Sequence, residues 1–176
     1  MHYTSEWPRE PEIVIVDDEP SITNLLVRGL NKRGLHRVSV ERDPWTVVNR
    51  YRPSEPDLLV VDLHMPGIDV FEAIRSLRLV AAPTPHLPVL AMSGDTDEVL
   101  RNMAFAAGAT DFIAKPFAIA DICRRVEMLL DARLVALADA RLFGRPSRSF
   151  ERLIGAPPEV LPADDRREIG AVSMYV

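Results

Sequence analysis

The sequence is poor in cysteine and lysine and holds no long apolar run. Its only cysteine, Cys123, cannot form an internal disulfide and cannot supply a cysteine-based zinc site by itself. The apolar runs fall far short of the roughly 18 residues that a membrane span needs. Residues 1–10 lack the apolar core of a signal peptide. These absences predict a cytoplasmic protein that does not bind a membrane.

A surplus of basic residues is also missing. The chain has 21 Lys and Arg residues against 26 Asp and Glu residues, so its net charge is −5. A chain that binds nucleic acid normally carries a basic face, so we expect no direct nucleic-acid binding by this chain. Lysine occurs only as Lys32 and Lys115, which makes the positions of these two residues informative.

What the chain does have is enough apolar material for one ordinary core. Hydrophobic residues make up 47% of its 176 residues, which excludes wholesale disorder. From residue 12 onward, short apolar segments alternate with longer segments whose apolar residues recur at helical spacing. The expected strands cover residues 13–16, 38–40, 58–61, 88–92 and 112–114. Strict alternation of this kind predicts a parallel sheet with helices on both faces.

The alternating pattern stops near Gly144. Four prolines stand among charged residues in 144–176, and no further strand and helix follow there. We interpret this segment as a linker or a C-terminal tail.

Polar residues follow four of the five expected strands. Asp17 and Asp18 follow the first, Asp62 the third, Ser93 the fourth and Lys115 the fifth. The carboxyl ends of parallel strands meet at one edge of the sheet, where such sheets place their binding sites. We therefore expect these five side chains to lie close together.

The chemistry of this set points to a metal ion and a phosphoryl group. Three carboxylates repel one another unless a cation joins them, and hard oxygen ligands suit Mg²⁺. A metal ion, the lysine and the serine hydroxyl would together offset and bind phosphoryl oxygens. A carboxylate can itself be the nucleophile and form an aspartyl phosphate.

Four segments resemble the motifs of one protein family. Residues 15–20, 61–69, 92–94 and 108–117 resemble, in the same order, the motifs of bacterial response-regulator receiver domains. The resemblance covers about residues 11–131. Any one of these motifs alone is weak evidence, but four in the right order at the right strand ends are specific.

The resemblance implies a role for each acidic residue. Asp62 would accept a phosphoryl group from a sensor histidine kinase or a phosphotransfer protein. Asp18 and Asp62 would bind Mg²⁺, or Mn²⁺ in its place, through their side chains, together with the backbone carbonyl of His64. Asp17 would act mainly through a metal-bound water. A side-chain metal contact from His64 is the alternative, although its ring is expected at the rim of the site.

The resemblance also implies roles for three further residues. Lys115 would pair with the phosphoryl oxygens, and its peptide bond to Pro116 would be cis. Ser93 would move to hydrogen-bond the phosphoryl group, and Phe112 would turn inward with it. The simpler alternatives are that Ser93 caps the following helix and that Phe112 is an ordinary core residue.

The implied fold is a flavodoxin-like, doubly wound sheet of five parallel strands in the order 2-1-3-4-5, with five flanking helices. Residues 1–10 would be an N-terminal tail and 11–131 the receiver domain. Residues 132–143 would extend the last helix, and 144–176 would follow as the linker or tail.

The expected function is a phosphorylation-dependent switch rather than an enzyme, with at most self-phosphorylation from small phosphodonors and loss of that group. An apolar stripe at Leu130, Leu134 and Leu137 suggests a homodimer through the fourth helix, the last strand and the final helix. The main alternative is the regulatory part of a longer protein, with an enzymatic or DNA-binding output beyond residue 176. A receiver that no longer signals by phosphate and a small-molecule phosphatase are less consistent with the motifs.

Overall fold

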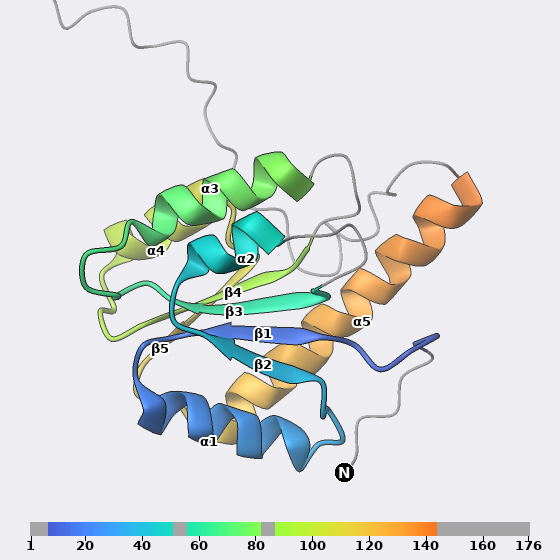
Figure 1. The fold of residues 1–176 in the computed structure, drawn as a ribbon, viewed down its shortest axis with the longest axis horizontal. Helices are drawn as coiled ribbons and strands as arrows, with labels where there is room; N and C mark the ends of the chain where they lie inside the picture. The colour runs from blue at the N-terminus through green and yellow to red at the C-terminus, as the bar shows by residue number, and fades with distance from the viewer. Residues whose placement is uncertain (1–6, 51–55, 82–86, 144–176) are drawn as a thin grey trace, which may run out of the picture.

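The computed structural model describes residues 7–50, 56–81 and 87–143. In these ranges five strands alternate with five helices (Figure 1). The strands are β1 (Ile13–Val16), β2 (Val38–Glu41), β3 (Leu58–Asp62), β4 (Val89–Ser93) and β5 (Asp111–Ala114). The helices are α1 (Pro20–Asn31), α2 (Pro44–Arg50), α3 (Val70–Ala81), α4 (Glu98–Ala107) and α5 (Ile119–Phe143). The expected tail at 144–176 lies outside the described residues.

The strands form one sheet in the order β2-β1-β3-β4-β5, and every neighbouring pair is parallel. Helix α1 contacts α5. On the other side, α2 contacts α3, and α3 contacts α4. Figure 1 shows the first pair on one face of the sheet and the other three on the opposite face. The predicted doubly wound architecture and strand order are confirmed.

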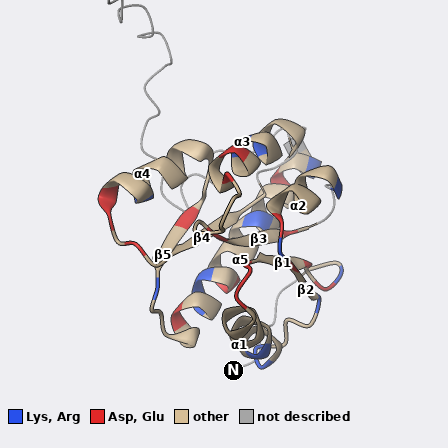
Figure 2. Ribbon diagram, turned by 60° about the vertical axis from the view of Figure 1, so that its left-hand side comes forward, with Lys and Arg blue, Asp and Glu red and all other residues tan. Residues whose placement is uncertain are grey.

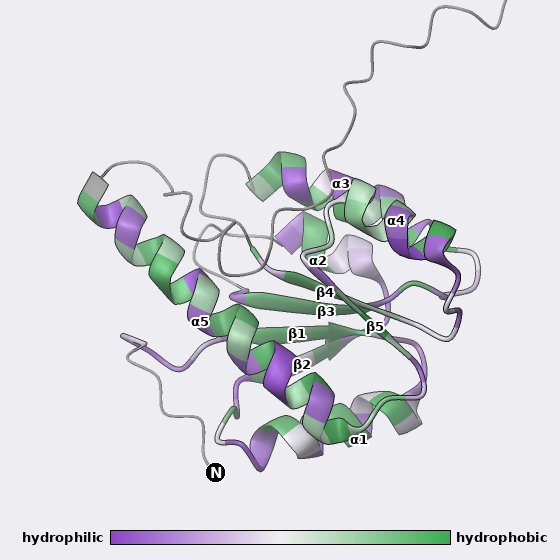
Figure 3. Ribbon diagram, turned by 180° about the vertical axis from the view of Figure 1, so that it is seen from behind, coloured by the Kyte–Doolittle hydropathy of each residue, from purple (hydrophilic) through white to green (hydrophobic). Residues whose placement is uncertain are grey.

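Two hydrophobic layers hold the sheet between the helices. In β1, Val14 and Val16 belong to the layer shared with α3 and α4, whereas Ile13 and Ile15 belong to the layer shared with α1 and α5. This division follows from the two-residue period of a strand. Because both faces of the central strands are covered, β1 is apolar at every position (Figure 3), and β3 is apolar at every position before its last residue, Asp62. Each fully buried Val, Leu or Ile side chain contributes about 1.5–3 kcal/mol to the stability of the fold, relative to an exposed one.

Arg78 of α3 fastens the turn between α4 and β5 at the amino end of the sheet. Its Nε donates to the carbonyl of Gly108 at 2.9 Å, and its Nη1 donates to the carbonyl of Leu87. Gly108 ends α4 with a φ of 113°, and a Cβ atom there would lie 2.8 Å from the Arg78 side chain. Glycine is therefore required at this position by backbone conformation and by space.

A second anchor lies at the same end of the sheet and is built around Asp57, which precedes β3 and is 1% exposed. Arg9 lies 2.8 Å from its carboxylate, and the Glu12 amide also donates to that carboxylate at 2.8 Å. The Nε of Arg133, a fully buried residue of α5, lies 4.0 Å from the same group. Asp57 thus joins the segment before β1 to the second half of α5.

Helix α5 is a single helix of 25 residues. Leu130 is fully buried in the layer shared with α1, so this member of the apolar stripe is not available to a partner. Leu134 and Leu137 are partly buried. Among the described residues, no helix combines the length and the apolar character that crossing a membrane requires.

Candidate functional site

The structure brings the predicted side chains together at the carboxyl edge of the sheet. Asp17 and Asp18 follow β1, Asp62 and Ser93 end β3 and β4, and Lys115 follows β5. Figure 2 shows further acidic residues at the start of α4, which begins near this edge. The parallel topology therefore collects at one place residues that are spread over about a hundred positions of sequence.

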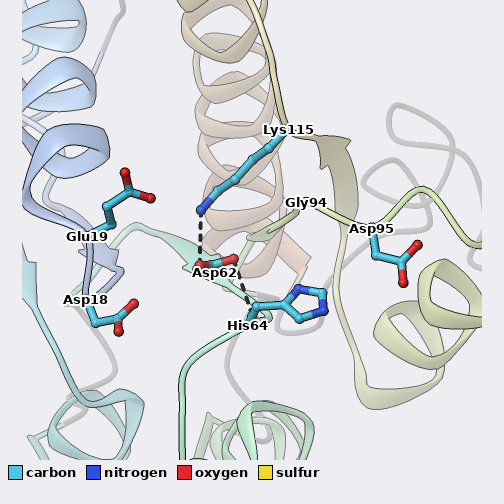
Figure 4. A pocket seen from close by; sticks show the side chains of 7 residues that line it. All are labelled: Asp18, Glu19, Asp62, His64, Gly94, Asp95 and Lys115. Carbon is cyan, nitrogen blue, oxygen red and sulfur yellow. Dashed lines mark hydrogen bonds and ion pairs between the residues drawn. The ribbon is translucent and has the colours of Figure 1, made fainter.

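Lys115 is the cation at the centre of the acidic residues. Its Nζ lies 3.0 Å from an oxygen of Asp62 and 3.1 Å from an oxygen of Asp17 (Figure 4 shows the contact with Asp62). The other oxygen of Asp17 accepts the backbone N–H of Glu19 at 2.8 Å. Both oxygens of Asp17 are therefore engaged, whereas Asp18 is exposed to solvent.

The environment shifts the pKa values of two of these groups. Burial raises the pKa of Asp17 above its ordinary value, and the bonds from Glu19 and Lys115 offset this only in part. Burial alone would lower the pKa of Lys115, but its hydrogen bonds to Asp62 and Asp17 outweigh burial and raise it. The lysine is therefore a firmly held cation.

The carboxylates have the arrangement of a cation site. One oxygen each from Asp17, Asp18 and Asp62 lies within 4.8 Å of the others. A single lysine does not neutralise three carboxylates, and these hard oxygen donors fit a cation such as Mg²⁺. The set could thus hold a metal ion.

Ser93 and His64 meet beside the acidic residues. Ser93 is fully buried, and its hydroxyl oxygen accepts the backbone N–H of Asp95 at 2.9 Å. The same oxygen lies 3.2 Å from Nδ1 of the exposed His64 ring. The backbone N–H of His64 in turn donates to Asp62 at 3.3 Å. The ring contact with Ser93 was not anticipated, because sequence places His64 only at the rim.

Phe112 lies on β5, partly buried against the layer beneath α3 and α4. The peptide bond between Lys115 and Pro116 is cis, as expected. The Lys115 amide donates to the Ser93 carbonyl at 2.6 Å, so the segments carrying these two residues are tied together.

The site opens into a cavity of about 570 Å³. It is lined by Asp18, Glu19, Asp62, His64, Gly94, Asp95 and Lys115 (Figure 4). Sequence reasoning did not single out Glu19 as a lining residue, although its place directly after the acidic pair was a usable signal. The cavity gives a ligand direct access to Asp62.

Comparison with curated proteins finds relatives over the same part of the chain. The transcriptional regulatory protein CreB of Escherichia coli is 36% identical over 66% of this chain and 49% of its own length. The transcriptional regulatory protein TrcR of Mycobacterium tuberculosis is 32% identical over 67% of this chain and 44% of its own length. The chain spans about half the length of the curated relatives that it matches.

Solved structures show the same fold. The chemotaxis protein CheY4 of Vibrio cholerae superposes with a TM-score of 0.60 at 21% identity, over 69% of this chain and 99% of its own. The BeF₃-activated receiver domain of DrrB superposes with a TM-score of 0.60 at 24% identity, over 70% of this chain and 99% of its own.

The family assignment rests on a match that is longer than any single motif. The model of the response regulator receiver domain matches residues 13–127, from the first residue of β1 into α5. This stretch contains all the strands described above and every residue of the site. The chain therefore belongs to the family of response regulator receiver domains of two-component systems.

Proposed function

We propose that this chain is a phosphorylation switch in which Asp62 accepts a phosphoryl group from a histidine kinase. The observation that carries the proposal is the position of Asp62. Its carboxylate faces the cavity, lies 3.0 Å from the Lys115 ammonium group and belongs to a cluster of three carboxylates. A nucleophile, a fixed cation and an additional cation site together suit phosphoryl transfer.

In the proposed reaction an oxygen of Asp62 attacks the phosphorus atom of a phosphohistidine. The new O–P bond forms as the P–N bond breaks, and the imidazole leaves with the electron pair of that bond. Lys115 is placed to pair with the phosphoryl oxygens as their charge moves toward this site. Small phosphodonors such as acetyl phosphate would react in the same way.

The acidic residues would hold the metal ion that this reaction needs. Asp18 and Asp62 would bind Mg²⁺, or Mn²⁺, through their side chains, together with the backbone carbonyl of His64. Asp17 would act through a bound water, since both of its oxygens already have partners. When bound, the ion offsets the charge on the phosphoryl oxygens.

The switch would follow from the new charge on Asp62. Ser93 would turn to hydrogen-bond the phosphoryl group, and Phe112 would move inward with it. Because Ser93 precedes α4 and Phe112 lies on β5, a small local change would alter the surface formed by these elements and α5. That surface would control self-association or another partner.

The relatives favour a second possibility for the output. Both relatives named above are transcriptional regulatory proteins, and this chain corresponds to about half of each. The chain would then be the receiver part of a regulator whose output lies in a further segment.

Intact-mass measurement tests the proposed acceptor. Incubation with acetyl phosphate and Mg²⁺ should add one phosphoryl group to the chain. Asp62→Asn should prevent the addition and keep the fold, since the two side chains are nearly isosteric. Asp69→Asn is the matched control, because Asp69 lies in the loop after the same strand but outside the cavity. Labelling that persists in Asp62→Asn would place the nucleophile elsewhere.

A further inference from the structure

We propose that the side chain of His64 is a latch that engages the Ser93 hydroxyl until Asp62 is phosphorylated, and so sets how readily the domain switches. The inference rests on the proposed function, because it assigns a regulator to the same site. His64 would be a positioning residue that acts through Ser93.

The latch is a contact between the rim of the cavity and a buried hydroxyl. His64 is exposed, but its Nδ1 atom lies 3.2 Å from Oγ of Ser93, a residue that is 0% exposed. The backbone of the same histidine donates to Asp62. His64 therefore contacts both the proposed acceptor and the proposed switch residue.

The hydrogen-bonding capacity of a hydroxyl explains why this contact matters. A serine hydroxyl has one proton to donate and two lone pairs that accept. In Ser93 the Asp95 N–H occupies one lone pair at 2.9 Å. In the proposed latch the Ser93 hydroxyl donates its proton to the nearby Nδ1 of His64, and the ring carries its own hydrogen on Nε2.

A phosphoryl group would compete for that same proton. Phosphoryl oxygens can only accept hydrogen bonds, so Ser93 must give them its proton in order to bind them. It cannot donate that proton to His64 at the same time. Phosphorylation must therefore break the contact with His64, and the strength of this contact opposes switching.

The size of the effect follows from one hydrogen bond between neutral groups. Such a bond shifts an equilibrium by about two- to tenfold. Because the His64 ring is exposed and competes with water, we expect the lower part of this range. Removal of the ring should thus favour the switched state about two- to fivefold.

Binding of beryllofluoride with Mg²⁺, a non-covalent mimic of the phosphoryl group, provides the test. Calorimetric titration of the full chain should show about two- to fivefold tighter binding to His64→Leu than to the wild type. His64→Asn is the conservative variant, since its amide can keep a polar contact with Ser93, and it should bind nearly as the wild type does. Because His64 is exposed, its variants should keep the fold, and circular dichroism of each variant checks this point.

The Ser93→Ala background separates the latch from other effects of the ring. If His64 acts through Ser93, then His64→Leu should change beryllofluoride affinity only when Ser93 is present. An equal change in both backgrounds would overturn the latch. The effect would then come from steric hindrance by the ring or from changed access of water to the site. An unchanged affinity in the single variant would also overturn it.

The same titration distinguishes failure of the latch from failure of the proposed function. A wild-type chain that binds beryllofluoride, with no binding by Asp62→Asn, supports the proposed function whatever His64 does. A wild-type chain that does not bind beryllofluoride would overturn both proposals together.

Discussion

Lys115 donates a hydrogen bond to the buried carboxylate of Asp17 across 98 positions of sequence. The two residues follow β5 and β1, and strands β3 and β4 lie between those strands in the sheet. The lysine side chain therefore reaches across the carboxyl ends of the strands and links the edge strand β5 to the inner strand β1. Because this cation also contacts Asp62, any change to it or to Asp17 alters the electrostatics of the whole site.

Asp17→Asn should stabilise the metal-free protein by about 1 kcal/mol at neutral pH. Burial raises the pKa of Asp17, so the folded state binds its proton more tightly than the unfolded state does. The free energy of unfolding attributable to Asp17 therefore falls as pH rises from the ordinary carboxyl pKa of about 4 through the raised value. The amide of the Asp17→Asn variant does not ionise, so the variant does not lose stability in this way as pH rises.

Urea denaturation in the presence of a chelator, repeated at several pH values, measures this difference. The gap between Asp17→Asn and the wild type should open as pH rises above about 4. Mg²⁺ should then stabilise the wild type more than the variant. Asp69→Asn is the exposed control, and a pH-independent gap would contradict the role of ionised Asp17.

Asp18→Ala should weaken Mg²⁺ binding more than Asp17→Ala does. Asp18 is exposed and lies beside Asp62, so it is the carboxylate available for direct ligation. Both oxygens of Asp17 are already bonded, to Lys115 and to the Glu19 amide. Titration of each variant with Mg²⁺ or Mn²⁺ gives the affinities, and equal losses would refute the different roles.

Arg78→Met should lower the free energy of unfolding by about 2–3 kcal/mol. The variant keeps the apolar stem but removes the donors to the carbonyls of Gly108 and Leu87. Arg75→Met on the same helix is the control, because its ion pair with Glu72 is exposed and should contribute less than about 1 kcal/mol. Similar losses in both variants, measured by urea denaturation, would argue against the anchor.

Self-association should depend on the exposed face of α4. Val99 and Met103 are 62% and 48% exposed and lie four residues apart, so they share one side of the helix. We expect beryllofluoride to raise the mass in solution of the wild type but not of Met103→Glu. Leu79→Glu, on the exposed side of α3, should behave as the wild type. An unchanged wild-type mass would leave control of another partner as the output.

The fold could be predicted because its signals are local. The apolar run at Ile13–Val16 predicts a buried strand, and the acidic residue that ends β3 predicts a site residue. Neither prediction needs knowledge of distant residues. The pairing of Asp57 with Arg9 and Arg133 gives no such signal, since it depends on how three separate segments pack. The full burial of Leu130 against α1 gives no local signal either, because periodicity shows that a helix has an apolar side but not how far a neighbour covers it.

The contact between His64 and Ser93 illustrates the same limit within the site. The sequence places both residues after strands that proved to be adjacent, β3 and β4. It does not fix the rotamer of an exposed ring, which decides whether the ring reaches a buried hydroxyl. Residue types and strand ends predict the members of a site, whereas the contacts among them depend on the three-dimensional packing of their side chains.

Helix α5 begins four residues after Lys115 and continues past the buried Arg133, which is held near Asp57 at the opposite end of the sheet. Its 25 residues correspond to about 37 Å, more than twice the length of any strand that it crosses. A helix is a stiff rod, so a tilt near Arg133 would be carried to both of its ends. A tilt of about 5° at that point would displace the end of the helix, about 15 Å further on, by about 1 Å.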